Sequence, residues 1–124
     1  MQPLNLTPVE IKAYVPARDF ELSKNFYQAM GFTMGWASEQ MAYFHCGHKS
    51  FLLQNFHVQQ HTENFMMHLL VENADDWHQH LTDNFIAERF GVAISLPEDR
   101  PWDMRDFTLI DPSGVLWRIG HSLS

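Results

Sequence analysis

The residue types most often used as metal ligands and nucleophiles are present in this chain, but their spacing favours few sites. Eight histidines and one cysteine occur in 124 residues. His78 and His80 lie two residues apart in a segment with helical periodicity, so their side chains point in different directions. Cys46 has no histidine or asparagine that the sequence places beside it, which favours a buried structural thiol over a nucleophile. The sequence also contains no nucleophile elbow, P-loop or dinucleotide-binding fingerprint.

The position of Trp102 is typical of a binding surface. It follows Pro101 in the polar segment Pro97–Asp103, whereas a core tryptophan normally lies within a strand or a helix. Trp102 is therefore expected either to line a groove or to pack across a subunit interface, and both alternatives stay open. Aromatic rings hold planar ligands by stacking and cationic groups by cation–π attraction. Further flat surface is expected from Tyr14, Trp36 and Tyr43.

The net charge of the chain excludes some classes of binding partner. The chain has 15 acidic residues against 8 lysines and arginines, a formal net charge of -7. Nucleic acids and anionic membranes both attract basic surfaces, so neither is an expected partner. Four of the acidic residues flank Trp102. They form either an ordinary solvated loop or a rim that attracts cationic ligands. The acidic residues of this loop are Glu98, Asp99, Asp103 and Asp106.

Composition also predicts the compartment. Hydrophobic residues make up 45% of the chain, enough for a core, and no apolar run is long enough to span a bilayer. The first residues, MQPLNLTPVE, lack the basic and apolar regions of a signal peptide. A single cysteine excludes an internal disulfide. These features predict a cytoplasmic protein.

Periodicity predicts a strand, a helix and three strands in the first half of the chain. Alternation from Val9 to Val15 indicates a strand that Pro16 ends, and Asp19 and Gly31 fit the two ends of a helix. A polar segment at residues 57–64 is typical of a linker. The three short strands between them are expected at Phe32–Ser38, Met41–Cys46 and Phe51–Phe56.

The same order of elements recurs in the second half. A strand at Phe65–Glu72 and a helix at Ala74–Phe85 precede three strands, the last two joined by the Asp-Pro-Ser-Gly turn at residues 111–114. We therefore expect one domain over residues 1–124, with repeat units at about 9–56 and 65–122. The three strands are expected at Phe90–Leu96, Met104–Ile110 and Val115–Gly120.

Two segments resemble a known family. VPARDFELSKNFYQAMGF and RPWDMRDFTLIDPSGVLWRIG are similar to the first helix and last hairpin of the vicinal-oxygen-chelate superfamily, which includes glyoxalase I, extradiol dioxygenases and fosfomycin- and bleomycin-resistance proteins. Trp102, nine residues before Asp111, is most similar to the bleomycin-resistance group. The resemblance implies an α+β fold in which two βαβββ repeats form a cup-shaped mixed sheet with helices on its outer face. It also implies a homodimer, which builds the ligand sites in many relatives.

The same resemblance provides a test for metal. Ligands in metal-using relatives come from the first and last strands of each repeat, which correspond here to Lys12, Gln54, Met66 and Arg118. Lysine and arginine repel a metal ion, and methionine sulfur suits hard ions poorly, so only Gln54 is a plausible ligand. We therefore expect no metal and no other cofactor. One alternative set of ligands stays open, namely Gln54 with His45 and His68.

Strand alternation places these positions on the face of the sheet that lines the cup. Apolar neighbours such as Ile11, Leu53 and Trp117 are expected to face the helices instead. Lys12 and Arg118 then bring positive charge to the cup floor. These cations either bind a carboxylate or phosphate of the ligand or pair with acidic residues elsewhere in the chain.

The leading hypothesis is a metal-free, small-molecule-binding protein of the bleomycin-resistance type. It would sequester bleomycin or another flat amphipathic molecule in an aromatic-lined groove, and a binding protein is favoured over an enzyme. The alternatives are a metal-dependent lyase, isomerase or dioxygenase with displaced ligands, and a partner-binding domain with a filled cup. No catalytic residue is assigned. The expected ligand contacts are Trp102, Tyr14, His68, Arg118, Lys12, Gln54, Met66 and Trp36.

Overall fold

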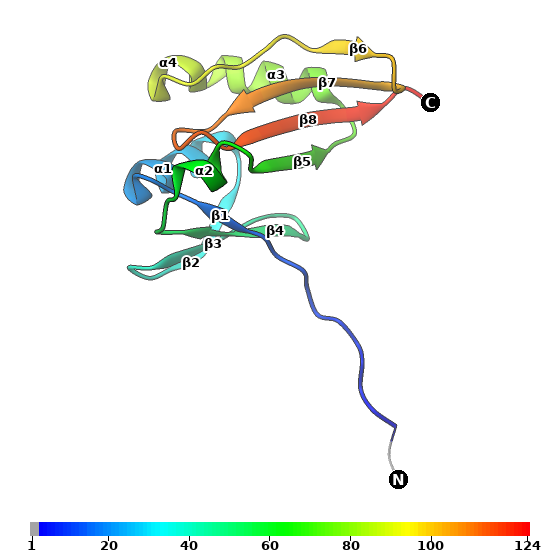
Figure 1. Cartoon of the computed structure of the whole chain (residues 1–124). Coiled ribbons are helices and arrows are strands. Elements are labelled where there is room, and N and C mark those ends of the chain that lie inside the picture. The colour runs from blue at the N-terminus through cyan, green and yellow to red at the C-terminus, as the bar shows by residue number, and fades with distance from the viewer. Residues whose placement is uncertain (1–2) are drawn as a thin grey trace.

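The computed structural model describes residues 3–124, in which the order strand, helix, three strands occurs twice (Figure 1). The first repeat consists of β1 (Tyr14–Pro16), α1 (Phe20–Met30), β2 (Thr33–Ala37), β3 (Met41–Cys46) and β4 (Lys49–Gln54). A short helix, α2 (Gln59–Thr62), lies in the connection. The second repeat consists of β5 (Met66–Leu70), α3 (Ala74–Asp83), α4 (Ile86–Phe90), β6 (Glu98–Arg100), β7 (Met104–Ile110) and β8 (Leu116–Ser122).

Each repeat builds one four-stranded mixed sheet, and the two sheets have the same topology. The strand orders are β1-β4-β3-β2 and β5-β8-β7-β6. In each sheet the first strand of the repeat runs parallel to the last, and the other neighbours are antiparallel. Figure 1 shows the sheets as separate open layers. The predicted α+β fold with two βαβββ repeats is thus confirmed.

The helix boundaries follow local signals in the first repeat more closely than in the second. Asp19 caps α1, since its Oδ1 accepts a hydrogen bond from the Leu22 amide at 3.1 Å, and Gly31 ends the helix with a φ of 127°. The helix predicted at residues 74–85 is α3, and a second helix, α4, follows it in residues that were not predicted to be helical. α3 ends at Asp83, and Phe85 adopts a left-handed φ of 55° before α4 begins.

Two predicted strands differ from the structure. The segment expected to be a strand at residues 90–96 makes only an isolated bridge, between Ile94 and Leu109. The second strand of this repeat, β6, forms in the segment predicted to be a loop, where it pairs with β7 and Arg100 forms ion pairs with Glu98 and Asp106. The first predicted strand is shorter than expected, because β1 begins only at Tyr14.

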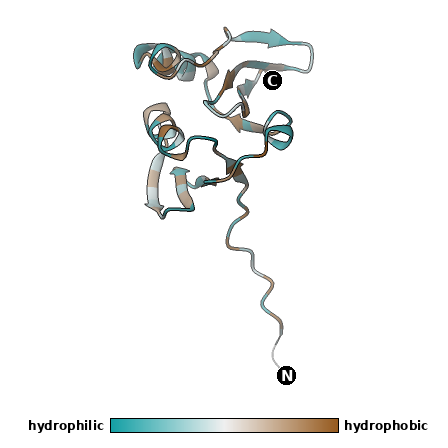
Figure 2. Cartoon of the chain, turned by 60° about the vertical axis from the view of Figure 1, so that its left-hand side comes forward, coloured by the Kyte–Doolittle hydropathy of each residue, from teal (hydrophilic) through white to brown (hydrophobic). Residues whose placement is uncertain are grey.

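Residues 3–13, which we call the arm, leave the body of the molecule as an extended segment (Figures 1 and 2). Ile11 was expected to face the helices, but it lies on the arm and is 93% exposed. The prediction failed because the alternating pattern continues beyond the point where the paired strand begins. None of the helices among residues 3–124 is long and apolar enough to cross a bilayer.

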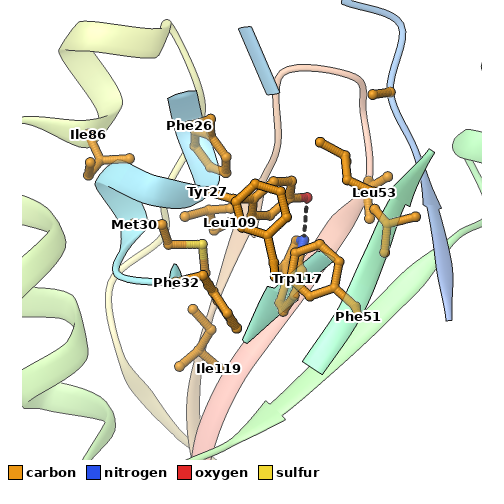
Figure 3. Packing of buried hydrophobic residues seen from close by; sticks show 14 of the residues in the cluster. Phe26, Tyr27, Met30, Phe32, Phe51, Leu53, Ile86, Leu109, Trp117 and Ile119 are labelled. Carbon is orange, nitrogen blue, oxygen red and sulfur yellow. Dashed lines mark hydrogen bonds between the residues drawn. The ribbon is translucent and has the colours of Figure 1, made fainter. Parts of the chain in front are cut away.

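The helix-covered faces of the two sheets, called inner faces from here on, share one hydrophobic core (Figure 3). The opposite faces, which were expected to line the cup, are called the outer faces. Tyr27 of α1 contacts Phe51 of β4 with ring centroids 4.9 Å apart, and Phe51 contacts Trp117 of β8 at 5.4 Å. Both contacts are edge-on, the arrangement that aromatic rings prefer. Leu53 and Trp117 therefore face the core, as predicted. Each fully buried side chain of this size contributes about 1.5–3 kcal/mol through burial.

A buried hydrogen-bond chain ties the repeats together at the Asp-Pro-Ser-Gly turn. The Tyr27 hydroxyl donates to Asp111 Oδ2 at 2.5 Å and accepts from Trp117 Nε1 at 3.0 Å. The other oxygen of Asp111 accepts from the amides of Ser113 and Val115 at 2.8 and 2.9 Å. Burial raises the pKa of the Asp111 carboxyl, and the hydrogen bond from Tyr27 opposes that rise. This turn therefore has a structural role.

Candidate ligand-binding faces

The outer face of the first sheet carries a row of side chains that crosses all four strands. Tyr14, Leu52, Tyr43 and Trp36 are successive partners in the register of β1, β4, β3 and β2. The Trp36 and Tyr43 rings stack with centroids 6.2 Å apart and planes 12° apart. His45, two residues along β3, also stacks with Tyr43, with ring centroids 5.7 Å apart. We call Tyr14, Trp36, Tyr43 and His45 the aromatic face.

A glycine makes this stacking possible. The register of β2 and β3 shifts between Met34 and Trp36, so Gly35 lies in a bulge. A Cβ atom at Gly35 would lie 2.8 Å from Cδ2 of Tyr43, closer than a real side chain allows. The missing side chain lets the Tyr43 ring lie flat against β2. An isolated glycine within a strand is the sequence signal for such a close approach.

The base of the arm rests on the aromatic face. Lys12 Nζ lies 2.9 Å from Glu10 Oε2 and 5.7 Å from the centre of the Tyr43 ring. Glu10 Oε1 accepts hydrogen bonds from the hydroxyls of Ser50 and Tyr43. The hydrogen bond with Glu10 raises the pKa of Lys12. Of the two roles open to Lys12, the structure shows pairing with an acidic residue.

The outer face of the second sheet is organised around one buried carboxylate. The side chain of Asp106 is 1% exposed, and its Oδ1 accepts hydrogen bonds from Arg100 Nε and Arg118 Nη1, both at 2.9 Å. Arg100 also contacts Glu98 at 3.0 Å. His68 is the register partner of Arg118 on the neighbouring strand β5. We call His68, Arg100, Trp102, Asp106 and Arg118 the arginine face.

Glycine again makes room for the central side chain. Gly120 is the register partner of Asp106, and a Cβ atom there would lie 2.7 Å from Cβ of Asp106 and 3.0 Å from the Arg105 carbonyl oxygen. Asp106 therefore lies flat on the sheet beneath the two guanidinium groups. Its Oδ2 atom is buried and has no hydrogen-bond partner within the described part of the chain. The prediction that Asp106 belongs to a solvated acidic loop was wrong.

Trp102 lies in the tight turn between β6 and β7. The turn is closed by a hydrogen bond of 3.2 Å from the Asp103 amide to the Arg100 carbonyl, and Asp103 adopts a left-handed φ of 64°. Aspartate tolerates this conformation better than most residues. The Trp102 side chain is 58% exposed, and its ring centre lies 5.8 Å from Cζ of Arg118. The turn thus places an open indole beside the Arg118 guanidinium.

The predicted ligand contacts fall into two groups. Lys12, Tyr14, Trp36 and Gln54 belong to the first sheet or the arm beside it, whereas Met66, His68, Trp102 and Arg118 belong to the second. The two sheets are not hydrogen-bonded to each other in the part of the chain that the structure covers. They adjoin between β4 and β5, where a cavity of about 100 Å³ is lined by residues that include Ser50 and His68.

Sequence reasoning missed the roles of Arg100 and Asp106. Their signal was alternation in β7, which places Asp106 on the same face as Arg118 of the adjoining strand. Both Lys12 and Arg118 pair with acidic residues, the second of the alternatives that the sequence left open. Asp99 of the acidic loop also pairs with a cation, Arg105, at 3.0 Å.

The donor atoms do not fit the metal site of the metal-using relatives. Two of the four corresponding positions, Lys12 and Arg118, are cations held in ion pairs. No three His, Cys, Asp or Glu side chains among residues 3–124 lie close enough together to hold a metal ion. In the alternative set, Gln54 and His45 lie at opposite ends of the β3–β4 pair, since Gln54 is the register partner of Met41 and His45 that of Ser50. One chain therefore does not assemble that alternative set.

Solved structures with the same fold include both binding proteins and an enzyme. A bleomycin-binding protein complexed with bleomycin has a TM-score of 0.76 and 18% identity, covering 93% of this chain and 99% of that chain. The antibiotic binding protein TnmS3 from Streptomyces sp. CB03234 has a TM-score of 0.74 and 19% identity, covering 95% and 99%. Lactoylglutathione lyase from Agrobacterium tumefaciens has a TM-score of 0.67 and 17% identity, covering 93% and 95%. At identities of 17–19%, these similarities show that the fold is shared and nothing further.

Sequence comparison extends the relationship from fold to family. No curated protein sequence matches the chain significantly. The family model described as the Glyoxalase/Bleomycin resistance protein/Dioxygenase superfamily matches residues 9–119, which is most of the chain. This match includes both repeats and the two segments whose resemblance was noted in the sequence. The chain therefore belongs to the Glyoxalase/Bleomycin resistance protein/Dioxygenase superfamily.

Proposed function

We propose that the protein binds and sequesters a flat, amphipathic small molecule without metal and without chemical conversion. The observation that carries this proposal is the row of aromatic side chains across the first sheet, with Tyr14 and Trp36 about half exposed. The ring of Trp36 stacks nearly parallel on Tyr43, which fixes the plane of the exposed indole. A planar ligand gains both apolar burial and ring stacking on such a surface.

Related proteins support a role in binding. Proteins described as bleomycin-binding and antibiotic binding share this fold over nearly the whole chain. Sequestration requires affinity alone, so ion-paired side chains at Lys12 and Arg118, where relatives carry metal ligands, are compatible with it. If the ligand is a toxic antibiotic, resistance follows from its removal from solution.

We further propose that the binding groove forms in a homodimer. The arm carries four apolar side chains, Leu4, Leu6, Val9 and Ile11, that are 83–98% exposed. The outer face of the second sheet also leaves two large apolar side chains open, Met66 and Leu70. Contiguous exposed apolar surface is typical of an interface. In a symmetric pair, the aromatic face of one copy would cover the arginine face of the other and produce two equivalent grooves.

A fluorescence titration with metal-free bleomycin tests the binding function. We expect saturable quenching at micromolar concentrations or below, weakened by Trp36→Ala and by Trp102→Ala because both indoles lie on the proposed groove. Trp77→Phe is the matched control, since Trp77 lies on α3 and outside both faces. Bleomycin that causes no saturable change up to millimolar concentrations would refute the proposal for this ligand. Stoichiometric metal with chelator-sensitive turnover would favour the lyase, isomerase or dioxygenase alternative.

Light scattering coupled to size exclusion tests the dimer. The full chain is expected to elute with twice the mass of one copy. Replacing Leu4, Leu6 and Val9 by serine removes apolar surface from the arm without touching the body, so it should shift the equilibrium toward monomer. A full chain that is monomeric at high micromolar concentration would contradict the proposed groove.

A further inference from the structure

We infer that the arginine face binds an oxyanion, such as a carboxylate, attached to an aromatic ring of the ligand, with Arg118 as the direct anion contact. This inference rests on the proposed binding function and names the ligand class of the same groove. Three features carry it, namely unused donors on Arg118, a buried carboxylate that fixes two guanidinium groups, and an open indole beside them.

Only some of the hydrogen-bond donors of the Arg118 guanidinium are used within the described residues. Its Nη1 donates to Asp106 at 2.9 Å, and its Nε and Nη2 donate to no protein acceptor within residues 3–124. The side chain is 29% exposed, so part of it is open to a ligand. A guanidinium presents its N–H groups in a planar fork that matches the two oxygens of a carboxylate.

Asp106 acts as a positioning residue and does not itself reach the ligand. It is buried, and one of its oxygens accepts from both guanidinium groups, so it holds Arg100 and Arg118 side by side. Held in this way, the arginines lose less side-chain entropy when an anion binds.

On this face two guanidinium groups share one buried carboxylate. Arg100 and Arg118 carry two positive charges against the single negative charge of Asp106. Glu98 also pairs with Arg100, but its side chain is 64% exposed and its charge is therefore screened by water and salt. His68, the register partner of Arg118, supplies a further polar group at the same level of the sheet.

Trp102 sets the position of an aromatic ring relative to the anion. Its ring centre lies 5.8 Å from Cζ of Arg118, and the side chain is exposed. A ligand ring stacked on this indole would bring a directly attached carboxylate toward the guanidinium. Lys12 on the aromatic face is less suited to this role, because Glu10 already pairs with it.

Matched small probes test the inference. Isothermal titration calorimetry with 2-naphthoate and 2-naphthamide compares an anion with a neutral molecule of the same shape. The wild type is expected to bind 2-naphthoate at least about tenfold more tightly. Arg118→Gln should remove this preference and leave the affinity for 2-naphthamide nearly unchanged. Arg105→Gln is the control, since Arg105 lies on the next strand but pairs with Asp75 and Asp99, and it should keep the preference.

A second measurement uses the unaltered protein, so it does not depend on the stability of the Arg118→Gln variant. Phenylglyoxal modifies accessible guanidinium groups, and peptide mass spectrometry reports the extent at each arginine. We expect 2-naphthoate, but not 2-naphthamide, to protect Arg118. Equal protection by both probes, or none, would overturn the assignment of Arg118 as the anion contact.

The outcomes separate this inference from the binding function. If both probes bind equally and Trp36→Ala weakens both, the protein binds flat ligands and the oxyanion site is refuted. If 2-naphthoate is preferred and bleomycin does not bind, the oxyanion site holds and bleomycin is excluded as the ligand. If neither probe nor bleomycin binds, the proposed function fails and the inference fails with it.

Discussion

The two outer faces are built on the same strand order but hold their side chains by different forces. On the aromatic face, Trp36, Tyr43 and His45 are ordered by ring stacking at the surface. On the arginine face, a fully buried Asp106 fixes two cations above it. A repeated backbone topology therefore does not dictate the chemistry of the face. That chemistry is set by the few side chains at the centre of each sheet.

Both faces also depend on a glycine, but to different degrees. Gly35 makes room for the edge of the Tyr43 ring, a flexible side chain that can shift. Gly120 makes room for Asp106. The atoms nearest to Gly120 are the Cβ and Cα of Asp106 and the Arg105 carbonyl oxygen, which cannot shift without moving the backbone of β7. The arginine face is thus the less adaptable of the two, and its variants should have the larger effects.

Removal of the central carboxylate should have the largest effect. Asp106→Ala leaves two guanidinium groups without their buried partner, so we expect a loss of about 3–5 kcal/mol in the free energy of unfolding. Glu10→Ala, which removes the exposed acid beside the aromatic face, should leave the urea midpoint nearly unchanged. Urea denaturation of both variants measures the difference. Equal losses would show that the two faces do not differ in this way.

The two glycines provide the next comparison. Gly120→Ala should cost about 1–3 kcal/mol in unfolding free energy, because the new methyl group overlaps Asp106 and the backbone of β7. Gly35→Ala should cost less, since the Tyr43 ring can rotate away. Thermal and urea unfolding of the two variants would measure this order, and a larger loss for Gly35→Ala would reverse our ranking of the faces.

Ligand selectivity should distinguish the two indoles. Trp36→Ala removes stacking alone, so it should weaken 2-naphthoate and 2-naphthamide by similar factors, equivalent to about 0.5–1.5 kcal/mol. Trp102→Ala should weaken 2-naphthoate more, because its indole also contacts Arg118. Calorimetry with both probes on both variants measures the four affinities. The assignment of separate roles fails if both variants reduce the two affinities by one common factor.

The smallest expected effect concerns an exposed ion pair on the opposite side of β7. The hydrogen bond from Arg105 lowers the pKa of Asp75 below 3.8. The folded carboxyl then binds its proton less readily than the unfolded one, so the pair stabilises the protein above about pH 4 and loses this effect as the pH falls through the lowered pKa. Asp75 is exposed, so the contribution should stay below about 1 kcal/mol.

Urea midpoints of the wild type and Asp75→Asn between pH 2 and pH 6 would check this effect. The two curves should differ slightly at pH 6 and converge at the acid end. A difference as large as that caused by Asp106→Ala would show that burial is not what separates the two carboxylates.

Local signals in the sequence predicted helix ends, a turn and the faces of strands in the two repeats. Asp19, Gly31 and the Asp-Pro-Ser-Gly turn act within a few residues of their own position, and the structure places each of them where the pattern indicated. Alternation along β7 and β8 likewise separated core residues such as Trp117 from outer residues such as Arg118.

The features that sequence reasoning missed depend on distant partners. Asp106 is buried because Arg118, twelve residues later, and Arg100, six residues earlier, both converge on it. Residues 98–100 are all charged, which is typical of a solvated loop. They form a strand because they pair with β7. Ile11 continues an apolar alternation past the last paired residue, where no neighbouring strand gives it a buried face.

The hydrogen-bond chain from Trp117 through Tyr27 to Asp111 has a consequence for the unfolding of the whole molecule. Tyr27 belongs to the first repeat, and its two partners belong to the second. Separating the repeats would break both of these hydrogen bonds and expose to water the hydrophobic core that the two repeats share. We therefore expect that neither repeat folds on its own and that heat or denaturant melts the protein in a single cooperative transition.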